Sequence, residues 1–350
     1  MKNIKALTIA ATKSGAGKTT LTIGILAALI RRGLDVQPFK SGPDFIDPTL
    51  HSSVTKKTSY NLDLKMMGRT SCQKTFYKHA LCSDISVLEG VMGLYDGGEA
   101  STASLAKLLG IPVILIIDAQ SSAQSSVAVL TGFQMYDPEV KIAGVIFNKI
   151  GSERHKQLID QAVVEKSSVP VIGYMPRDIA FEIPERHLGL HMGDENPLSS
   201  TELDRLADTV ENHLNLDLLV NAETSVDSEY SEERKITAAR IKPGDVRMAV
   251  AIDRAFCFYY RENFEILEAA GFEIVPFSPL KDRMIPDNCS MIYLGGGYPE
   301  LYARQLSGNT SMRASLRGVH KQGIPIYGEC GGFMYLCDRL VDMDETEFSM

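Results

Sequence analysis

A glycine-rich loop between a short apolar run and an amphipathic segment places the strongest constraint on how this chain can fold. The apolar run IKALTIAA (residues 4–11) leads into TKSGAGKTT (12–20), and the apolar residues of LTIGILAALIRRG (21–33) have helical spacing. Glycines allow successive backbone N–H groups to converge on a phosphate, and the amino end of a helix favours an anion. Strand, loop and helix in this order therefore predict a phosphate-binding loop in a parallel sheet.

The side chains of the loop fit the same interpretation. Lys18 supplies a point charge for phosphate oxygens, and the Thr19 hydroxyl is a ligand for Mg²⁺. The usual pattern has glycine where this chain has Thr12, whereas Lys13 resembles the deviant loop of partition ATPases and dethiobiotin synthetases. Asn148, in FNK at the end of a later apolar run, is placed to read the nucleotide base. The residues assigned to nucleotide binding are Lys13, Gly15, Gly17, Lys18, Thr19, Thr20 and Asn148.

Apolar runs alternate with helical patterns along most of the chain, which predicts parallel strands covered by helices on both faces. The further runs lie at 35–40, 84–90, 111–118, 140–148 and 169–175. The alternation stops in a polar, charged stretch and then restarts, so we predict two α/β domains joined by a linker. The predicted boundaries are 1–220 for the first domain, 221–245 for the linker and 246–350 for the second domain.

Acidic residues follow the strands that neighbour the phosphate loop. Asp44 and Asp47 come after the second run, Glu89 ends the third, and Asp96 lies in the glycine-rich loop behind it. Ligands bind at the carboxyl edge of an open parallel sheet, so we expect these carboxylates to meet there in solvent-facing loops. The predicted Mg²⁺ ligands are Thr19, Asp44, Asp47 and Glu89, and the predicted substrate contacts include Asp44, Asp47 and Asp96. The sequence leaves open which acid binds metal and which binds substrate.

A second candidate site lies in GECGGFMYL (328–336), where the spacing predicts a strand–turn–helix elbow that exposes Cys330 as a nucleophile. The alternative is a buried cysteine that packs as a small apolar residue. The six cysteines show no C-x-x-C pair, which predicts reduced thiols and a cytoplasmic protein without a zinc site. A net charge of −8 with interspersed signs argues against nucleic acid, and the lack of a long apolar run argues against a membrane.

Seven motifs in order resemble the cobyrinic acid a,c-diamide synthase family from residue 5 to about residue 340. They are SGAGKTT, FKSGPDFIDPTLH, YNLDLKMM, LEGVMGLYDGG, PERHLGL, LGGGYPELY and YGECGGFMYL. The resemblance implies a P-loop NTPase-type parallel sheet followed by a class I glutamine amidotransferase-like α/β domain. It also implies that ATP and Mg²⁺ phosphorylate substrate carboxylates of a corrin precursor, and that ammonia from glutamine attacks the acyl phosphates. Two alternatives stay open: a nickel-sirohydrochlorin a,c-diamide synthase, and a partition-type P-loop ATPase.

The resemblance also assigns individual roles and partners. It implies Cys330 as the nucleophile, Gly296, Gly297 and Gly331 as oxyanion-hole donors, and His187 as a substrate contact. The family's catalytic histidine lies downstream of the cysteine, and no histidine follows Cys330 here, so we interpret the amidotransferase domain as incomplete. We therefore expect this chain to use free ammonia better than glutamine. The expected partners are a tetrapyrrole and glutamine or ammonia, without nucleic acid or membrane, and a homodimer is an option.

Overall fold

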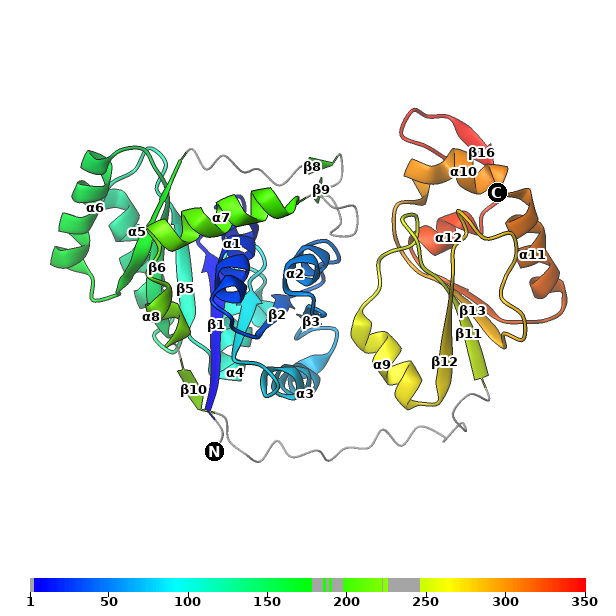
Figure 1. Cartoon of the computed structure of the whole chain (residues 1–350), viewed down its shortest axis with the longest axis horizontal. Coiled ribbons are helices and arrows are strands. Elements are labelled where there is room, and N and C mark those ends of the chain that lie inside the picture. Colours follow the sequence, from blue (N-terminus) through cyan, green and yellow to red (C-terminus); the bar gives the residue numbers. More distant parts are fainter. Residues whose placement is uncertain (1–2, 178–184, 187–188, 191–197, 222, 226–245) are drawn as a thin grey trace. The chain divides into compact units, whose positions relative to one another are not determined.

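The computed structural model describes residues 3–177, 185–186, 189–190, 198–221, 223–225 and 246–350 (Figure 1). It divides into two compact units, residues 1–232 and 233–350, which are considered separately below. Both units are built on parallel sheets, as the alternating pattern of the sequence predicts. No helix of the described residues has the length and apolar character needed to cross a bilayer.

Unit 1 contains a central sheet in the order β3-β2-β4-β1-β5-β6-β7, and all of these neighbours are parallel. The strands are β1 Asn3–Ala11, β2 Val36–Ser41, β3 Tyr60–Leu62, β4 Ile85–Glu89, β5 Val113–Asp118, β6 Ile142–Ile150 and β7 Val171–Pro176. All six apolar runs of the first predicted domain form strands. Of the seven strands in this order, the sequence prediction missed β3, since three residues are too few to show a period.

Two short pairings complete the strands of unit 1. Strand β10 (Glu223–Ser225) runs antiparallel to β1, so these residues, which we had assigned to the linker, extend the central sheet. The remainder of the predicted linker, 226–245, lies outside the described residues. Strands β8 (Glu185–Arg186) and β9 (Gly189–Leu190) pair only with each other among the described strands.

Helices cover both faces of the central sheet, and each face has its own hydrophobic core. One core joins alternate residues of the strands, such as Leu7 and Ile9, to α1 Lys18–Arg31, α2 Asp47–Thr55, α7 Ser200–His213 and α8 Leu216–Val220. The other core packs against α3 Gly68–Ala80, α4 Thr102–Leu109, α5 Gln124–Tyr136 and α6 Glu153–Lys166. A 3-10 turn, η1 (Gly98–Ala100), precedes α4. This layering fixes which side chains of β2 and β4 meet α1 and α2.

Unit 2 has a four-stranded parallel sheet in the order β12-β11-β13-β14. Its strands are β11 Val246–Ala251, β12 Phe272–Phe277, β13 Met291–Leu294 and β14 Ile326–Gly328, with a hairpin of β15 Arg339–Val341 and β16 Glu347–Ser349. Its helical segments are α9 Arg261–Ala269, η3 Pro299–Tyr302, α10 Ala303–Gly308, α11 Thr310–Lys321 and α12 Gly331–Tyr335. The main core includes Leu306 and Leu316 from α10 and α11, whereas Phe264 of α9 belongs to a smaller second core.

We predict that Gly173→Ala destabilises unit 1. A Cβ atom at Gly173 would lie 2.0 Å from the carbonyl oxygen of His213, where β7 meets Leu214 after α7. The backbone would have to shift, and overpacking of this kind costs about 1–3 kcal/mol. The measurement is urea unfolding followed by circular dichroism. Gly132→Ala in α5 is the matched control, because its Cβ would meet nothing within 4 Å. Equal stability of the two variants would contradict the prediction.

Candidate active site

The loop between β1 and α1 has the backbone conformation that phosphate binding requires. Gly15 and Gly17 adopt φ angles of 73° and 92°, in the left-handed region that glycine enters without strain. Gly17 is the N-cap of α1, and no side chain caps the first N–H groups of that helix. Uncapped N–H groups at a helix amino end attract anions. The loop therefore presents backbone donors where the sequence predicted them.

Lys18 extends from the start of α1 toward the loop that follows β4. Its Nζ donates a hydrogen bond to the carbonyl oxygen of Met92 over 2.5 Å. Only 9% of the surface of Lys18 is exposed. This burial lowers the pKa of Lys18, although nearby Glu89 opposes the shift. The lysine is thus held beside the phosphate loop by a neutral oxygen, an arrangement that leaves its charge available to an anion.

A buried ionic cluster lies next to this lysine, and Lys40 is its centre. Lys40 is the penultimate residue of β2 and is 2% exposed, and its Nζ forms ion pairs with Asp47 and with Glu89, the latter at 3.0 Å. The Thr19 hydroxyl lies 2.9 Å from Glu89 Oε1 and 3.3 Å from Asp47 Oδ2. Asp47 at the start of α2, Glu89 at the end of β4 and Thr19 beside the phosphate loop are therefore brought together; their role in binding metal stays a prediction.

The electrostatics of the cluster separate the two buried carboxylates. Burial would raise the pKa of Glu89, but Lys40 and His51 outweigh it and hold that pKa below its usual range. Burial and the charge of Glu89 together raise the pKa of Asp47 well above its usual range. Burial would lower the pKa of Lys40, yet Glu89, Asp47 and Asp44 raise it. Two carboxylates share one lysine, so the cluster attracts a further cation.

The donor set fits Mg²⁺ only if substrate and water complete it. No cluster of three or more His, Cys, Asp or Glu side chains suited to a metal occurs in the described part of the chain. Magnesium is commonly held by one or two carboxylates together with phosphate oxygens and water. The Thr19 hydroxyl and Asp47, which face each other beside the phosphate loop, match this smaller set.

Asp44 and Asp96 take part in loop hydrogen bonds. Asp44 Oδ1 accepts bonds from the N–H groups of Ile46 and Asp47 at the start of α2, and Oδ2 lies 3.5 Å from Lys40 Nζ. Asp96 Oδ2 accepts a bond from Gly93 N–H. The expectation that the predicted metal-binding acids face solvent is wrong for Glu89, which is fully buried, and for Asp47, which is 7% exposed. Strand β4 ends at Glu89 within the ionic cluster around Lys40, so the Glu89 carboxylate is enclosed there.

The other side chains predicted to bind nucleotide are those of Asn148, Lys13 and Thr20, and of these only Asn148 is hydrogen-bonded to the phosphate loop. The Asn148 amide donates to the carbonyl oxygen of Ala16 over 2.9 Å, and its oxygen accepts from Lys149 N–H, so Asn148 supports the loop. Lys13 is largely exposed, 3.5 Å from Asp118. Thr20 is half-buried on α1. The proposed reading of the nucleotide base by Asn148 stays a prediction. His187 lies outside the described residues.

Sequence reasoning missed Lys40 and gave His51 no role in the metal site. Both are inside FKSGPDFIDPTLH, which we used only as part of the family resemblance. The available signal was a lysine at the end of a buried strand, because such a cation needs an anionic partner. His51 is completely buried against Glu89 and does not face a substrate surface.

The predicted elbow is present in unit 2. Strand β14 ends at Gly328, α12 begins at Gly331, and the exposed Cys330 between them has φ 49° and ψ −116°. A positive φ in a residue other than glycine is strained, and such strain clusters at functional sites. Glu329 N–H bonds to Leu294 O and Gly332 N–H bonds to Gly295 O, which ties the elbow to the loop after β13.

The three predicted oxyanion glycines gather around this cysteine. A Cβ placed on Gly296 would lie 3.4 Å from Cys330 Sγ, and one placed on Gly331 would lie 3.1 Å from Gly297 N. A side chain at Gly296 would crowd the thiol, whereas one at Gly331 would crowd Pro299 and Gly297. Their role as hydrogen-bond donors to an oxyanion stays a prediction, but their location beside the thiol is the one it requires.

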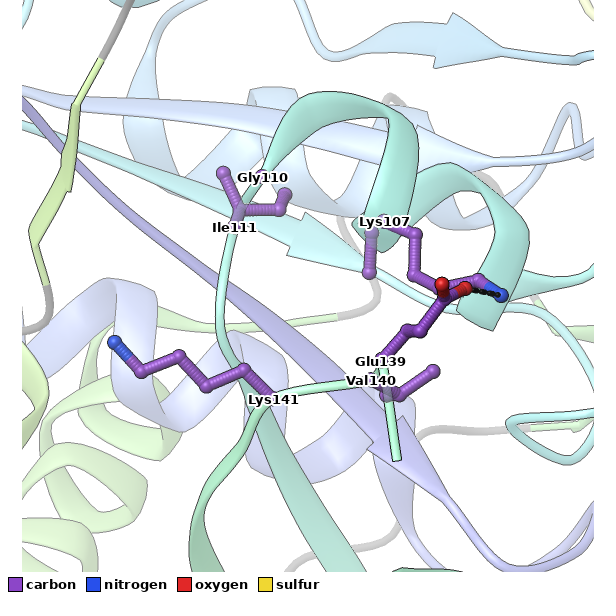
Figure 2. Close-up of a pocket in the computed structure, with 7 residues that line it drawn as sticks. Lys107, Gly110, Ile111, Glu139, Val140 and Lys141 are labelled. Carbon is purple, nitrogen blue, oxygen red and sulfur yellow. Dashed lines mark hydrogen bonds and ion pairs between the residues drawn. The ribbon is translucent and has the colours of Figure 1, made fainter. Parts of the chain in front are cut away.

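Figure 2 shows a pocket of unit 1 that is formed by segments preceding β5 and β6. The phosphate loop follows the carboxyl end of β1, so this pocket lies at the opposite edge of the parallel sheet. Lys107 in the pocket is paired with Asp137 at 2.6 Å and with Glu139 at 3.2 Å. The pocket is therefore not an extension of the phosphate site.

Comparison with protein families matches both units. Residues 7–190 match the CobQ/CobB/MinD/ParA nucleotide binding domain, and residues 247–350 match the CobB/CobQ-like glutamine amidotransferase domain. The first match confirms the P-loop NTPase-type fold and implies that the chain uses ATP. The second confirms the amidotransferase fold and favours an amidating ligase over the partition-type ATPase considered above.

Curated relatives give the same assignment over nearly the whole chain. A cobyrinate a,c-diamide synthase of Listeria innocua is 44% identical over 98% of this chain and 76% of its own length. One from Caldanaerobacter subterraneus is 42% identical over 98% of this chain and 75% of the relative. One from a Synechococcus strain is 40% identical over 99% and 76%. The chain belongs to the cobyrinate a,c-diamide synthase family of amidotransferase ligases in cobalamin biosynthesis.

Proposed function

We propose that this chain amidates the a and c side-chain carboxylates of cobyrinate through acyl phosphates that form with ATP and Mg²⁺ in unit 1. The observation that carries the proposal is that Asp47 and Glu89, which both pair with the buried Lys40, also bond to Thr19 of the phosphate loop. The names of the relatives at 40–44% identity favour cobyrinate over the nickel-sirohydrochlorin alternative. The cysteines are scattered along the chain, which fits the predicted cytoplasmic location, and the homodimer stays a prediction.

The chemistry explains why such a site is needed. A carboxylate oxygen is a poor leaving group, and phosphorylation turns it into a good one for attack by ammonia. The two reacting groups are both anions, so their approach requires positive charge and oriented dipoles. Lys18 and the uncapped N–H groups of α1 supply these from the protein.

A bound Mg²⁺ would neutralise the phosphate oxygens of ATP. Thr19 and Asp47 would hold it, with Asp44 and Glu89 as the further candidates. Asp96, Asp44 and Asp47 lie in the loops that a substrate carboxylate would reach, and we propose them, together with His187, as substrate contacts. Each of these residue roles follows from the resemblance and from the arrangement of the loops.

We propose that unit 2 releases ammonia from glutamine. Cys330 would attack the side-chain amide to give a thioester and ammonia, while Gly297 and Gly331 N–H groups, with the Gly296 loop, stabilise the oxyanion. The thiol needs a base that takes its proton and returns a proton to the leaving amine. In the part of the chain that the structure describes, no hydrogen bond joins Cys330 to a histidine.

Lys18→Ala should reduce ATP-dependent amidation of cobyrinate by at least about a hundredfold, since it removes a preorganised charge from the transition state. The measurement is ADP release with cobyrinate, MgATP and ammonium chloride. Lys166→Ala, an exposed lysine near the end of α6, is the matched control and should keep the parent rate. Near-normal turnover by Lys18→Ala would overturn the phosphate-loop assignment.

Asp47→Asn should raise the Mg²⁺ concentration needed for half-maximal activity by about tenfold or more, because it removes a proposed ligand. Asp44→Asn should have a smaller effect, since one Asp44 oxygen already holds the turn into α2. Glu89→Gln should also lower thermal stability, because Lys40 would lose a buried partner. Titrating Mg²⁺ in the ammonium-dependent assay tests all three variants. An Asp47→Asn variant with parent Mg²⁺ dependence would remove Asp47 from the metal site.

The 350-residue chain should use ammonium far better than glutamine. Among the described residues no histidine is bonded to the Cys330 thiol, so no group is in place to take its proton and return one to the leaving amine. Amidation rates with each nitrogen donor should be measured for the parent and for Cys330→Ala. We expect equal rates with ammonium and near-background rates with glutamine. Strong glutamine-dependent activity that disappears in Cys330→Ala would show that a residue such as His320 serves as the base.

A further inference from the structure

Both carboxylate oxygens of Glu89 form hydrogen bonds, and the partner of the second oxygen, His51, has no role in the function proposed above. Its Oε1 accepts bonds from Thr19 Oγ1 and Lys40 Nζ, while its Oε2 lies 2.6 Å from Nε2 of His51. The side chains of Glu89 and His51 are both completely buried. The other ring nitrogen of His51, Nδ1, lies 3.1 Å from Ser59 Oγ. All four polar atoms of the two side chains are therefore engaged.

The position of His51 in α2 explains how it reaches Glu89. His51 follows Asp47 by four residues, so both side chains lie on the same face of the helix. Asp47 contacts Lys40 and Thr19 from the first turn, and His51 contacts Glu89 from the second. One helical face thus carries a candidate metal ligand and the residue that fixes the neighbouring carboxylate.

We propose that His51 is a positioning residue of the nucleotide site: through Nε2 it fixes the Glu89 carboxylate, and Glu89 in turn orients the Thr19 hydroxyl. This inference rests on the proposed Mg²⁺-dependent ATP site. A hydroxyl has one proton and two lone pairs. When Thr19 donates its proton to Glu89 Oε1, its lone pairs are left for a cation beside Asp47.

The geometry of a carboxylate explains why Glu89 needs the hydrogen bond to His51 in addition to its contact with Lys40. Lys40 supplies the charge that makes a buried Glu89 tolerable, but one ammonium ion leaves the carboxylate free to rotate about its last torsion. The bond to His51 removes that freedom and satisfies Oε2, which would otherwise be a buried acceptor without a partner. Residues behind the direct ligands of a metal commonly change its affinity by about 10–100-fold.

Two substitutions separate the two ring nitrogens of His51. His51→Gln keeps an N–H group near the position of Nε2, whereas His51→Asn keeps one near the position of Nδ1. Only the glutamine variant can still bond to Glu89. Ser59→Ala removes the support of the ring from the other side and leaves His51 in place. The probe is Mn²⁺ with ADP, and free Mn²⁺ is measured by electron paramagnetic resonance on the full chain.

We expect His51→Asn to weaken Mn²⁺ binding in the presence of ADP by about tenfold or more, and His51→Gln to stay within about threefold of the parent. Ser59→Ala should weaken binding by a smaller factor. The half-saturating Mg²⁺ concentration in the ammonium-dependent assay should rank the variants in the same order. Circular dichroism confirms that each variant is folded.

Equal Mn²⁺ affinities of the asparagine and glutamine variants would overturn the inference. If neither variant folds, Ser59→Ala decides, and parent affinity in that variant would overturn it. The proposed function fails differently, because Asp47→Asn and Lys18→Ala would then leave nucleotide-dependent Mn²⁺ binding and turnover unchanged. If those two variants behave as expected while the His51 pair does not differ, only the positioning role is lost.

Discussion

The ion cluster around Lys40 is the interaction on which the arrangement of unit 1 depends. Lys40 and Glu89 are direct partners in the parallel register of β2 and β4, and both side chains point to the face covered by α1 and α2. A slip of one residue in that register would send one of them to the opposite face. Burying either charge alone costs several kcal/mol, so the pair selects the register that brings them together. The same register then determines where Thr19 and Asp47 find their partners.

The cluster also connects three segments that are far apart in the sequence. Thr19 lies in the first turn of α1 after the phosphate loop, Asp47 begins α2 after β2, and Glu89 ends β4 beside β1. Each stands at the carboxyl edge of the sheet, where helices start and their amino ends point at the ligand. A parallel sheet therefore supplies the charge arrangement needed to bring a nucleotide and a carboxylate together. The loops contribute the residues, and the strand order brings those residues to one place.

The sequence predicted the layers of the fold well and the centre of the site poorly. Apolar runs and the glycine loop report on local structure, so the strands, the phosphate loop and the elbow at Cys330 could be read from them. The role of Lys40 depends on which strand lies beside β2, and that neighbour, β4, is more than forty residues away in the chain. His51 was missed for the same reason, since its partner Glu89 belongs to a different segment. Pairings between distant segments leave no periodic signal in either one.

The candidate sites of the two units differ in charge and in exposure to solvent: the charged side chains of unit 1 are buried, and the thiol of unit 2 is exposed. In unit 1 the reacting groups are anions, so the site is lined by charges, and those charges are buried where water cannot weaken them. In unit 2 the proposed nucleophile would attack an uncharged amide, and Cys330 is accordingly exposed, with glycines as its neighbours. The strained φ of Cys330 is the cost of presenting the thiol beside those donors. A buried lysine among acids thus suits the activation of a carboxylate that we propose for unit 1, and an exposed cysteine among glycines suits the release of ammonia that we propose for unit 2.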